Sequence, residues 1–257
     1  MKIVILGFGK MGSWLANALA DVNEVAVYDI DSAKTGNAGH LKVLSGPAEI
    51  ASFKPEMLIN AVNLQNIISA FGSVSGHLSS ECIIADVASI KGNLPQYYAK
   101  CGLRFASMHP MFGPTFARMD SLKGENAIII SESDKSAAAL FRTFFSRYGL
   151  NISECSFDEH DKLMAYSLTL PFTSSIVFAA CLNRKTVPGT TFARHYGIAR
   201  GLLSEDDFLL AEVLFNQHSL AQLEKINSRL ELLKHIIRAR DYEEAQKFFA
   251  KLRDNLV

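Results

Sequence analysis

The first residues whose spacing could support chemistry form a glycine motif near the start of the chain, Gly7-Phe8-Gly9-Lys10-Met11-Gly12. The apolar run 2–6 precedes this motif and the amphipathic stretch 13–20 follows it, which predicts a strand, a tight turn and a helix. Gly7 allows the tight turn, Gly9 lets a pyrophosphate approach the backbone, and Gly12 lets the helix pack closely on the strand. The N–H groups and partial positive charge of the helix N-terminus favour phosphate, so the motif predicts a dinucleotide site.

An acidic residue stands at a suitable distance from this motif. Asp29 follows a second apolar run, 25–28, where its carboxylate could accept hydrogen bonds from an adenosine ribose diol and would repel a 2′-phosphate. We therefore expect NAD rather than NADP, and a flavin is disfavoured because nothing downstream indicates an isoalloxazine site. The alternative is a tight strand–helix turn without a ligand. Val62 ends the apolar run 57–62 and Asn63 follows it; both are expected beside the cofactor, since parallel sheets bind ligands at the carboxyl ends of their strands.

Apolar runs alternate with amphipathic stretches through the first 155 residues, a pattern typical of an α/β doubly wound sheet of the Rossmann type. Strands are expected at 2–6, 25–28, 41–44, 57–62, 82–86, 103–107 and 127–130, and a helix at 137–148 introduced by Ser133 or Asp134. From residue 156 the pattern is helical, with Asp158 expected to cap a helix that starts at Glu159. We expect an NAD-binding domain over 1–155 and an all-helical substrate and dimerisation domain over 156–257.

The helical part carries an apolar seam whose members recur three and four residues apart: Leu223, Ile226, Leu230, Leu233 and Ile237. This seam needs a partner, and a second copy of the chain is the simplest one, so we expect a homodimer. A helical domain closed on itself is the alternative. The apolar stretch 163–182 contains Pro171 and several hydroxyl side chains, which disfavours a membrane span and favours a buried interface helix.

The composition is that of an ordinary globular protein, with 49% hydrophobic and 20% charged residues among 257 and no net charge. The charge balance gives no support for a nucleic-acid or anionic-membrane partner. The four cysteines are widely spaced, without a Cys-x-x-Cys pair or a histidine cluster, so neither a metal site nor a disulfide is expected. Free thiols, and a strand in place of a signal peptide, favour a cytoplasmic protein.

Reactive side chains gather in three further segments, 86–91, 108–114 and 192–204. His109 follows an expected strand and precedes a proline, so an imidazole held there could act as a base near neutral pH; a structural histidine is the alternative. Ser89 and Lys91 follow another expected strand, where capping of the next helix is the plainer interpretation. His160, at an expected helix start, is interpreted as structural. The third segment contributes two rival anion-binding groups, Arg194 and Arg200.

Taken in order, the glycine motif, Asp-Val-Ala-Ser-Ile-Lys at 86–91, His-Pro-Met-Phe-Gly-Pro at 109–114 and Glu-His-Asp at 159–161 resemble the prephenate dehydrogenase family over nearly the whole chain. The resemblance implies NAD-dependent oxidative decarboxylation of prephenate to 4-hydroxyphenylpyruvate, on the path to tyrosine. It implies that His109 takes the substrate hydroxyl proton, that Ser89 holds the hydroxyl or the histidine, and that Lys91 adds positive charge near the nicotinamide or the substrate. Arg200 resembles the arginine that clamps a substrate carboxylate, with Arg194 as its alternative.

The chain departs from the family pattern at Ser-Leu-Thr-Leu-Pro-Phe, 167–172, where many relatives carry two histidines, and this leaves tyrosine feedback open. Arogenate dehydrogenase, with the same chemistry on the amino-acid analogue, is the nearest alternative.

A β-hydroxyacid dehydrogenase is a more distant alternative. It would need a catalytic lysine on the long helix, and Lys162 is badly placed for this role because it precedes the apolar part of that helix. From a different class, a non-catalytic NAD-binding sensor would need the glycine turn but no histidine near the nicotinamide.

Overall fold

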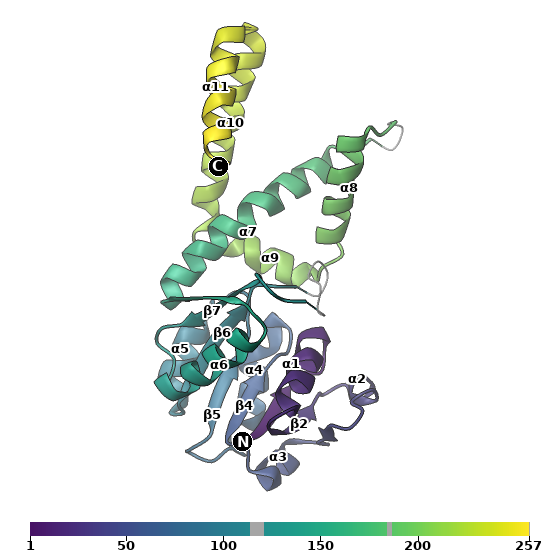
Figure 1. Ribbon diagram of the computed structural model, residues 1–257, viewed down its shortest axis with the longest axis vertical. Coiled ribbons are helices and arrows are strands. Elements are labelled where there is room, and N and C mark those ends of the chain that lie inside the picture. Colours follow the sequence, from purple (N-terminus) through teal and green to yellow (C-terminus); the bar gives the residue numbers. More distant parts are fainter. Residues whose placement is uncertain (114–120, 184–186, 257) are drawn as a thin grey trace. The chain divides into compact units, whose positions relative to one another are not determined.

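The structure is a computed structural model that describes residues 1–113, 121–183 and 187–256. The chain forms two units (Figure 1): unit 1 comprises Met1–Met164 with Ser204–Glu212, and unit 2 comprises Ala165–Leu203 with Val213–Val257. All described strands belong to unit 1, and unit 2 is helical. The sequence placed the boundary after residue 155, whereas the first turns of the long helix belong to unit 1 because they contribute buried side chains to it.

Within the described residues, unit 1 is built on one eight-stranded sheet in the order β3-β2-β1-β4-β5-β6-β7-β8 (Figure 1). The strands are β1 Lys2–Leu6, β2 Glu24–Tyr28, β3 Lys42–Val43, β4 Met57–Asn60, β5 Ile83–Asp86, β6 Phe105–Pro110, β7 Asn126–Ile130 and β8 Asn151–Cys155. Neighbours from β3 to β6 are parallel, β7 is antiparallel to β6, and β8 is parallel to β7. This order confirms the doubly wound Rossmann-type sheet, and the strand order reverses between β1 and β4, where such sheets bind ligands.

One edge of the sheet differs from the sequence-based expectation. Strand β6 continues to Pro110 instead of ending at residue 107, because Met108, His109 and Pro110 pair with β7. His109 therefore lies inside a strand, opposite Ile128, and not in a loop after one. Strand β8 has no counterpart among the expected strands; its side chains are exposed or only partly buried, so its apolar signal is weak.

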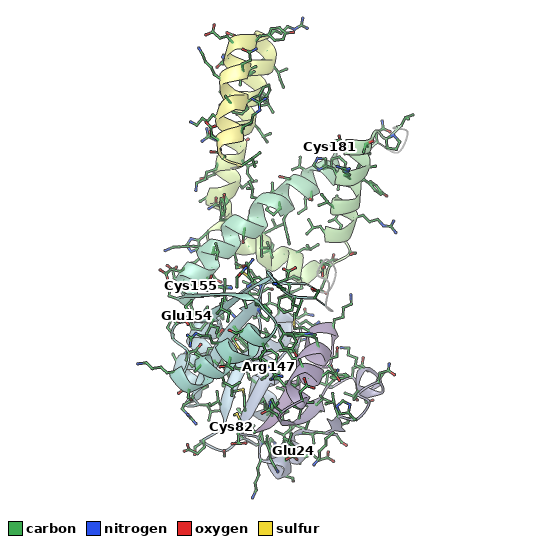
Figure 2. All side chains as sticks on the ribbon, viewed as in Figure 1. Glu24, Cys82, Arg147, Glu154, Cys155 and Cys181 are labelled. Atoms are coloured by element: carbon green, nitrogen blue, oxygen red, sulfur yellow. The ribbon has the colours of Figure 1, made fainter. Side chains whose placement is uncertain are left out.

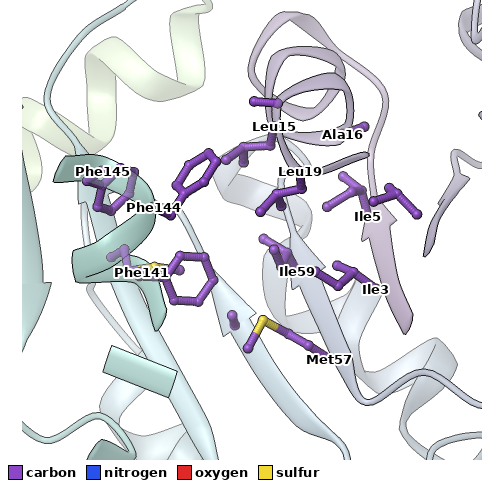
Figure 3. Close-up of a cluster of buried hydrophobic side chains, with 14 of the residues drawn as sticks. Ile3, Ile5, Leu15, Ala16, Leu19, Met57, Ile59, Phe141, Phe144 and Phe145 are labelled. Carbon is purple, nitrogen blue, oxygen red and sulfur yellow. The ribbon is translucent and has the colours of Figure 1, made fainter. Parts of the chain in front are cut away.

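Helices cover both faces of the sheet in unit 1: α1 Lys10–Ala20, α2 Ser32–Thr35, α3 Pro47–Phe53, η1 Leu64–Asn66, α4 Ile67–Ser75, α5 Leu94–Cys101 and α6 Lys135–Arg147. On one face, α1 and α6 meet the strands in a single apolar cluster (Figure 3) that includes Ile3, Ile5, Leu15, Leu19, Ile59, Phe141 and Phe145. On the other face, Tyr98 of α5 stacks on Phe105 of β6 with 4.1 Å between ring centroids. Because side chains alternate along a strand, this second face also receives Asp86 and His109.

Capping side chains fix where two helices near the site begin. Asp134 caps α6 by accepting two N–H bonds from its first turn. Helix α7, Phe157–Ala180, starts two residues earlier than expected, because Ser156 caps it and Asp158 does not. The Glu159 N–H donates to Ser156 Oγ at 3.3 Å and the Ser156 N–H donates to Glu159 Oε2 at 2.8 Å, a reciprocal capping box. With this start, His160 lies on the buried side of the first turn.

Unit 2 contains the rest of α7, α8 Thr190–Leu202, the end of α9 Asp207–Phe215, α10 Ser219–Ala239 and α11 Tyr242–Asp254. Buried Thr169 of α7 bonds to Ser219 of α10, with 2.7 Å between their hydroxyl oxygens. The expected seam lies on α10 and is substantially exposed in the single chain, with Leu223 at 43%, Leu230 at 48% and Ile237 at 64%. By length and apolar content alone α7 would also suffice to cross a membrane, but its first two turns carry the ionisable residues 158–162.

All four cysteines carry free thiols. Cys82 precedes β5 and Cys155 ends β8, and Figure 2 labels both in unit 1. Burial raises the pKa of the Cys82 thiol to about 11, so this thiol stays protonated at neutral pH. The described part of the chain contains no group of three or more His, Cys, Asp or Glu side chains that could hold a metal ion.

Candidate active site

A cavity of about 750 Å³ lies in unit 1 at the carboxyl ends of β1, β2 and β4. Its walls include five of the residues expected to bind a cofactor: Gly7, Gly9, Asp29, Val62 and Asn63. Of the other expected residues, Phe8 and Gly12 are buried, Met11 packs against the apolar core and Lys10 is exposed. Wall residues that sequence reasoning missed come from α2 and from the η1–α4 segment, among them Lys34, Asn66, Ser69 and Ser73.

Each of the three glycines in the motif is required, or tolerated, for a different structural reason. Gly7 has a φ of +86°, and a Cβ there would lie 2.8 Å from the backbone nitrogen of Val62. A Cβ on Gly12 would lie 1.9 Å from the carbonyl oxygen of Gly7, so α1 approaches the turn more closely than any side chain permits. A Cβ on Gly9 would meet nothing within 4 Å, although Gly9 lines the cavity. The turn therefore leaves an open cradle at Gly9, at the N-terminus of α1, which suits a phosphate.

These contacts predict opposite stability effects at two glycines of one motif. Gly12→Ala is expected to lower the free energy of unfolding by about 1–3 kcal/mol, because the new methyl group collides with backbone rather than with a flexible side chain. Gly9→Ala is the matched control and should unfold at the wild-type urea concentration, since its Cβ meets open space. Urea titrations that show no shift of the Gly12→Ala midpoint at an unchanged slope would contradict the close packing of α1 on the turn.

Asp29 is held firmly at the cavity wall. Its Oδ2 accepts the Phe8 N–H at 2.7 Å and its Oδ1 accepts the Asp31 N–H at 2.9 Å. The Lys34 ammonium lies 3.9 Å from Oδ1, and the Asp29 side chain is 6% exposed. The carboxylate thus joins β2 to the glycine turn and retains acceptor positions for a diol, because each oxygen can accept a second hydrogen bond.

A second polar cluster gathers around His109, at the same edge of the sheet as the cavity and two strands along from β4. His109 Nδ1 lies 3.0 Å from Nε2 of His160, and His160 Nδ1 lies 3.0 Å from Oδ1 of Asp161. His160 is fully buried and His109 is 7% exposed. The strand β6 and the first turn of α7 therefore place two imidazoles and one carboxylate in a continuous hydrogen-bonded row.

Lys91 lies in the interior and not at the open edge where it was expected to meet a nicotinamide or a substrate. Its ammonium is 2.8 Å from Asp86 Oδ1, and it donates to the Met108 carbonyl at 2.7 Å. Asp86 also accepts from the Tyr98 hydroxyl at 2.6 Å. Lys91 is only 1% exposed, and its ammonium contacts the strand that carries His109, while its expected role beside a nicotinamide or a substrate stays a prediction.

The backbone of Lys91 connects this ion pair to the histidine row. The Lys91 N–H donates to Asp161 Oδ1 at 3.2 Å, which is the oxygen that His160 also approaches. One residue of the β5–α5 loop therefore anchors β6 through its ammonium and α7 through its amide. The result is a fixed frame around His109 in which every link is 3.2 Å or shorter.

The surroundings of His109 and His160 lower the pKa of both imidazoles. Burial lowers the pKa of His109 well below 6.5, and the nearby His160 and Lys91 lower it further. Burial also lowers the pKa of His160, although its hydrogen bond to Asp161 opposes this shift. At neutral pH both imidazoles are therefore uncharged, and His109 has a lone pair with which it can accept a proton.

The remaining candidates lie elsewhere. Ser89 is half-buried in the loop between β5 and α5, which leaves the same edge of the sheet. Arg194 and Arg200 are exposed on α8 of unit 2. The structure places two further residues in the row with His109 that the sequence did not connect with it: His160, interpreted as structural, and Asp161. The pattern Ser-x-x-Glu at 156–159 could have revealed them, because a helix that begins there turns the next residue toward the core.

A Rossmann-type sheet whose glycine turn leaves an open cradle, with a carboxylate in the wall of the same cavity, is typical of a dinucleotide-binding protein. A family model described as the prephenate dehydrogenase nucleotide-binding domain matches residues 16–152, more than half of the chain. The chain belongs to the prephenate dehydrogenase family.

Solved structures of low sequence identity share the fold. Prephenate dehydrogenase from Aquifex aeolicus, in complex with hydroxyphenyl propionate and NAD+, superposes with a TM-score of 0.84 at 18% identity, over 99% of this chain and 96% of that one. Synechocystis arogenate dehydrogenase gives 0.77 at 18% identity over 100% of both chains. A 3-hydroxyisobutyrate dehydrogenase from Mycobacterium tuberculosis gives 0.55 at 14% identity over 70% and 64%. Comparison of the sequence with curated proteins finds no match.

Proposed function

We propose that this protein is an NAD-dependent prephenate dehydrogenase that converts prephenate to 4-hydroxyphenylpyruvate and CO₂. The observation that carries the proposal is His109: a buried, uncharged imidazole near the carboxyl end of β6, at the sheet edge that also holds the nucleotide cavity. A nucleotide-binding protein without chemistry has no need of a second histidine and an aspartate to hold such a group. Membership of the prephenate dehydrogenase family supports the same substrate class.

The cavity residues fit NAD. Gly9 leaves room for the pyrophosphate at the N-terminus of α1, and Asp29 presents a carboxylate toward the position of a ribose diol. Val62 and Asn63 form the wall at the end of β4. When bound, NAD supplies the acceptor for a hydride, and the residues of the chain orient the substrate and move its proton.

His109 has the properties of the required base. As hydride leaves the carbinol carbon of prephenate, the hydroxyl proton shifts to the His109 imidazole and the C–O bond gains carbonyl character. The bond from the ring to its carboxylate then breaks, and its electron pair makes the ring aromatic as CO₂ departs. The oxygen regains the proton from His109 and becomes the phenol, so atoms and charge balance without any further reactant.

Two further roles belong to the proposal. Ser89 lies in the loop that follows β5, and we assign its hydroxyl a hydrogen bond to the substrate hydroxyl or to the histidine. Arg200 clamps a substrate carboxylate, with Arg194 as its alternative, because a guanidinium fork matches a carboxylate. In segment 167–172, which departs from the family pattern, Thr169 is buried and forms a hydrogen bond with Ser219. No histidine of this segment is therefore available to bind a ligand.

We propose further that the protein is a cytoplasmic homodimer. The exposed apolar side chains of α10 would be covered by a second copy, and the four free thiols suit a reducing compartment. Sedimentation analysis should give twice the chain mass. A monomer at micromolar concentration would contradict this assembly.

Arogenate dehydrogenation is the second candidate, because the Synechocystis enzyme with that activity matches the fold over both complete chains. Product analysis separates the two. With prephenate and NAD we expect NADH, CO₂ and 4-hydroxyphenylpyruvate in equal amounts, whereas arogenate would give tyrosine in place of the keto acid. NADH without CO₂ would contradict both activities and favour another dehydrogenase.

Cofactor choice is predicted to depend on Asp29. Asp29→Ala should lower the preference for NAD over NADP by a factor of about 10–100, because hydrogen bonds to charged groups contribute about 1.5–3 kcal/mol. Lys34, which lines the cavity 3.9 Å from this carboxylate, would then be free to attract a 2′-phosphate. Adding Lys34→Ala should remove the gained NADP affinity. Equal NAD-to-NADP ratios of dissociation constants in wild type and Asp29→Ala would exclude this role.

The pH dependence of kcat/KM should follow the lowered pKa of His109. The base form of a histidine is present above its pKa, so the acidic limb of the profile is expected below 6.5, the pKa of an unperturbed histidine. Activity should therefore persist from neutral pH into mildly acidic buffer. An acidic limb at or above 6.5 would mean that His109 is solvated and exposed during turnover.

A further inference from the structure

We propose that Asp161 and His160 form a positioning dyad that fixes which ring nitrogen of His109 carries the proton, so that Nε2 is the basic atom offered to the substrate. This inference deepens the proposed function: it concerns the same site and the same base. Among the described residues, those that line the cofactor cavity do not include His160 or Asp161.

The carboxylate of Asp161 fixes the tautomer of His160. A carboxylate can only accept hydrogen bonds, so Nδ1 of His160, which lies 3.0 Å from Oδ1 of Asp161, carries a proton. The orientation of Asp161 is itself fixed, because the same Oδ1 accepts the backbone N–H of Lys91 at 3.2 Å. The carboxylate therefore selects one tautomer of His160.

The tautomer of His160 in turn fixes the tautomer of His109. A neutral His160 protonated on Nδ1 has a lone pair on Nε2, and this atom lies 3.0 Å from Nδ1 of His109. Nδ1 of His109 must then be the donor, which leaves the lone pair of His109 on Nε2. The reverse arrangement requires a doubly protonated His160, a buried cation that burial and the Lys91 ammonium both disfavour.

Among the described residues, charged and titratable groups around His109 and His160 come from three neighbouring elements. Asp161 lies on α7, Lys91 and Asp86 belong to β5 and its loop, and Cys155 ends β8. Lys91 and Asp86 are paired with each other at 2.8 Å, which leaves Asp161 as the acidic group bonded to the histidine row. A mutation of His160 thus tests the dyad without removing the buried Lys91–Asp86 ion pair.

Nitrogen NMR tests the dyad directly, without substrate. The protein contains seven histidines, and the signals of His109 and His160 can be assigned from His109→Asn and His160→Gln. In the wild type at neutral pH we expect His109 to show a protonated Nδ1 and an unprotonated Nε2. Observation of a proton on Nε2 of His109 would overturn the proposal whatever the protein catalyses.

Kinetics supply the second test. His160→Leu removes the acceptor and should lower kcat with prephenate by about 100-fold, the scale of a misplaced catalytic group, with KM changed by less than about twofold. His160→Gln retains an acceptor near Nε2 and should recover about tenfold of that loss. Asp161→Asn should exceed Asp161→Leu in kcat, because the Lys91 N–H holds the amide oxygen toward His160.

Three outcomes distinguish this proposal from the proposed function. Equal kcat in wild type and His160→Leu would overturn the dyad and leave prephenate oxidation intact. The expected NMR tautomer together with no turnover of prephenate or arogenate would support the dyad and reject the activity. Loss of kcat in His160→Leu accompanied by a wild-type His109 tautomer would also overturn the dyad, since the loss would then have another cause.

Discussion

Replacing His109 by Asn is expected to lower kcat by about 10²–10⁴-fold and to leave the dissociation constant of NAD unchanged. An amide cannot take up the hydroxyl proton, whereas the residues that line the nucleotide cavity stay in place. Asn also fits the volume of the buried site, so the fold should survive. Initial rates of NADH formation and a fluorescence titration of NAD binding measure the two quantities separately.

The matched control is His77→Asn, which changes an exposed histidine just beyond the end of α4. It should turn over at the wild-type rate. Wild-type turnover in His109→Asn would remove this residue from the mechanism and would favour a sensor that binds NAD without chemistry. Loss of NAD binding in the same variant would instead show that His109 contributes to the cofactor site.

Lys91→Met is expected to lower the free energy of unfolding by about 3–5 kcal/mol, the cost of leaving a buried carboxylate without its counter-ion. Asp86 is fully buried, and its remaining donors among the described residues would be the Tyr98 hydroxyl and the Ala88 N–H. The Met108 carbonyl would lose its donor as well. Urea unfolding at constant slope, followed by circular dichroism, measures the change.

Two control variants accompany Lys91→Met. Lys162→Met removes an exposed lysine that pairs with Asp158 one helical turn away, and its unfolding midpoint should stay close to the wild type. Lys91→Met combined with Asp86→Asn should recover part of the lost stability, because no buried charge then remains. If Lys91→Met and Lys162→Met shift the midpoint equally, the Lys91–Asp86 pair is solvated in solution and does not support β6.

The nucleotide half of the molecule was predictable because its signals are local. The turn at Gly7, the close approach at Gly12 and the carboxylate of Asp29 all depend on short stretches whose backbone geometry only certain residues allow. The doubly wound sheet followed from alternation of apolar runs and amphipathic helices, and the structure confirms it.

The second cluster was less predictable because its members meet across long stretches of sequence. His109 and His160 are 51 residues apart in the sequence. They meet because β6 pairs with the antiparallel strand β7 as far as Pro110 and because α7 starts at Phe157, two features that the sequence pattern did not predict. The sequence predicts Lys91 beside a nicotinamide or a substrate, but in the structure its ammonium is buried and pairs with Asp86 of the preceding strand. Residue type alone does not tell a ligand-binding lysine from a buried paired one.

The rate of NADH formation, with prephenate and with arogenate offered separately, tests whether this chain oxidises prephenate with NAD. We expect a kcat/KM for prephenate well above that for arogenate, and its loss in His109→Asn. A rate with arogenate alone would keep the chemistry and change the substrate. If protein that binds NAD forms no NADH with either substrate, the proposed activity is wrong.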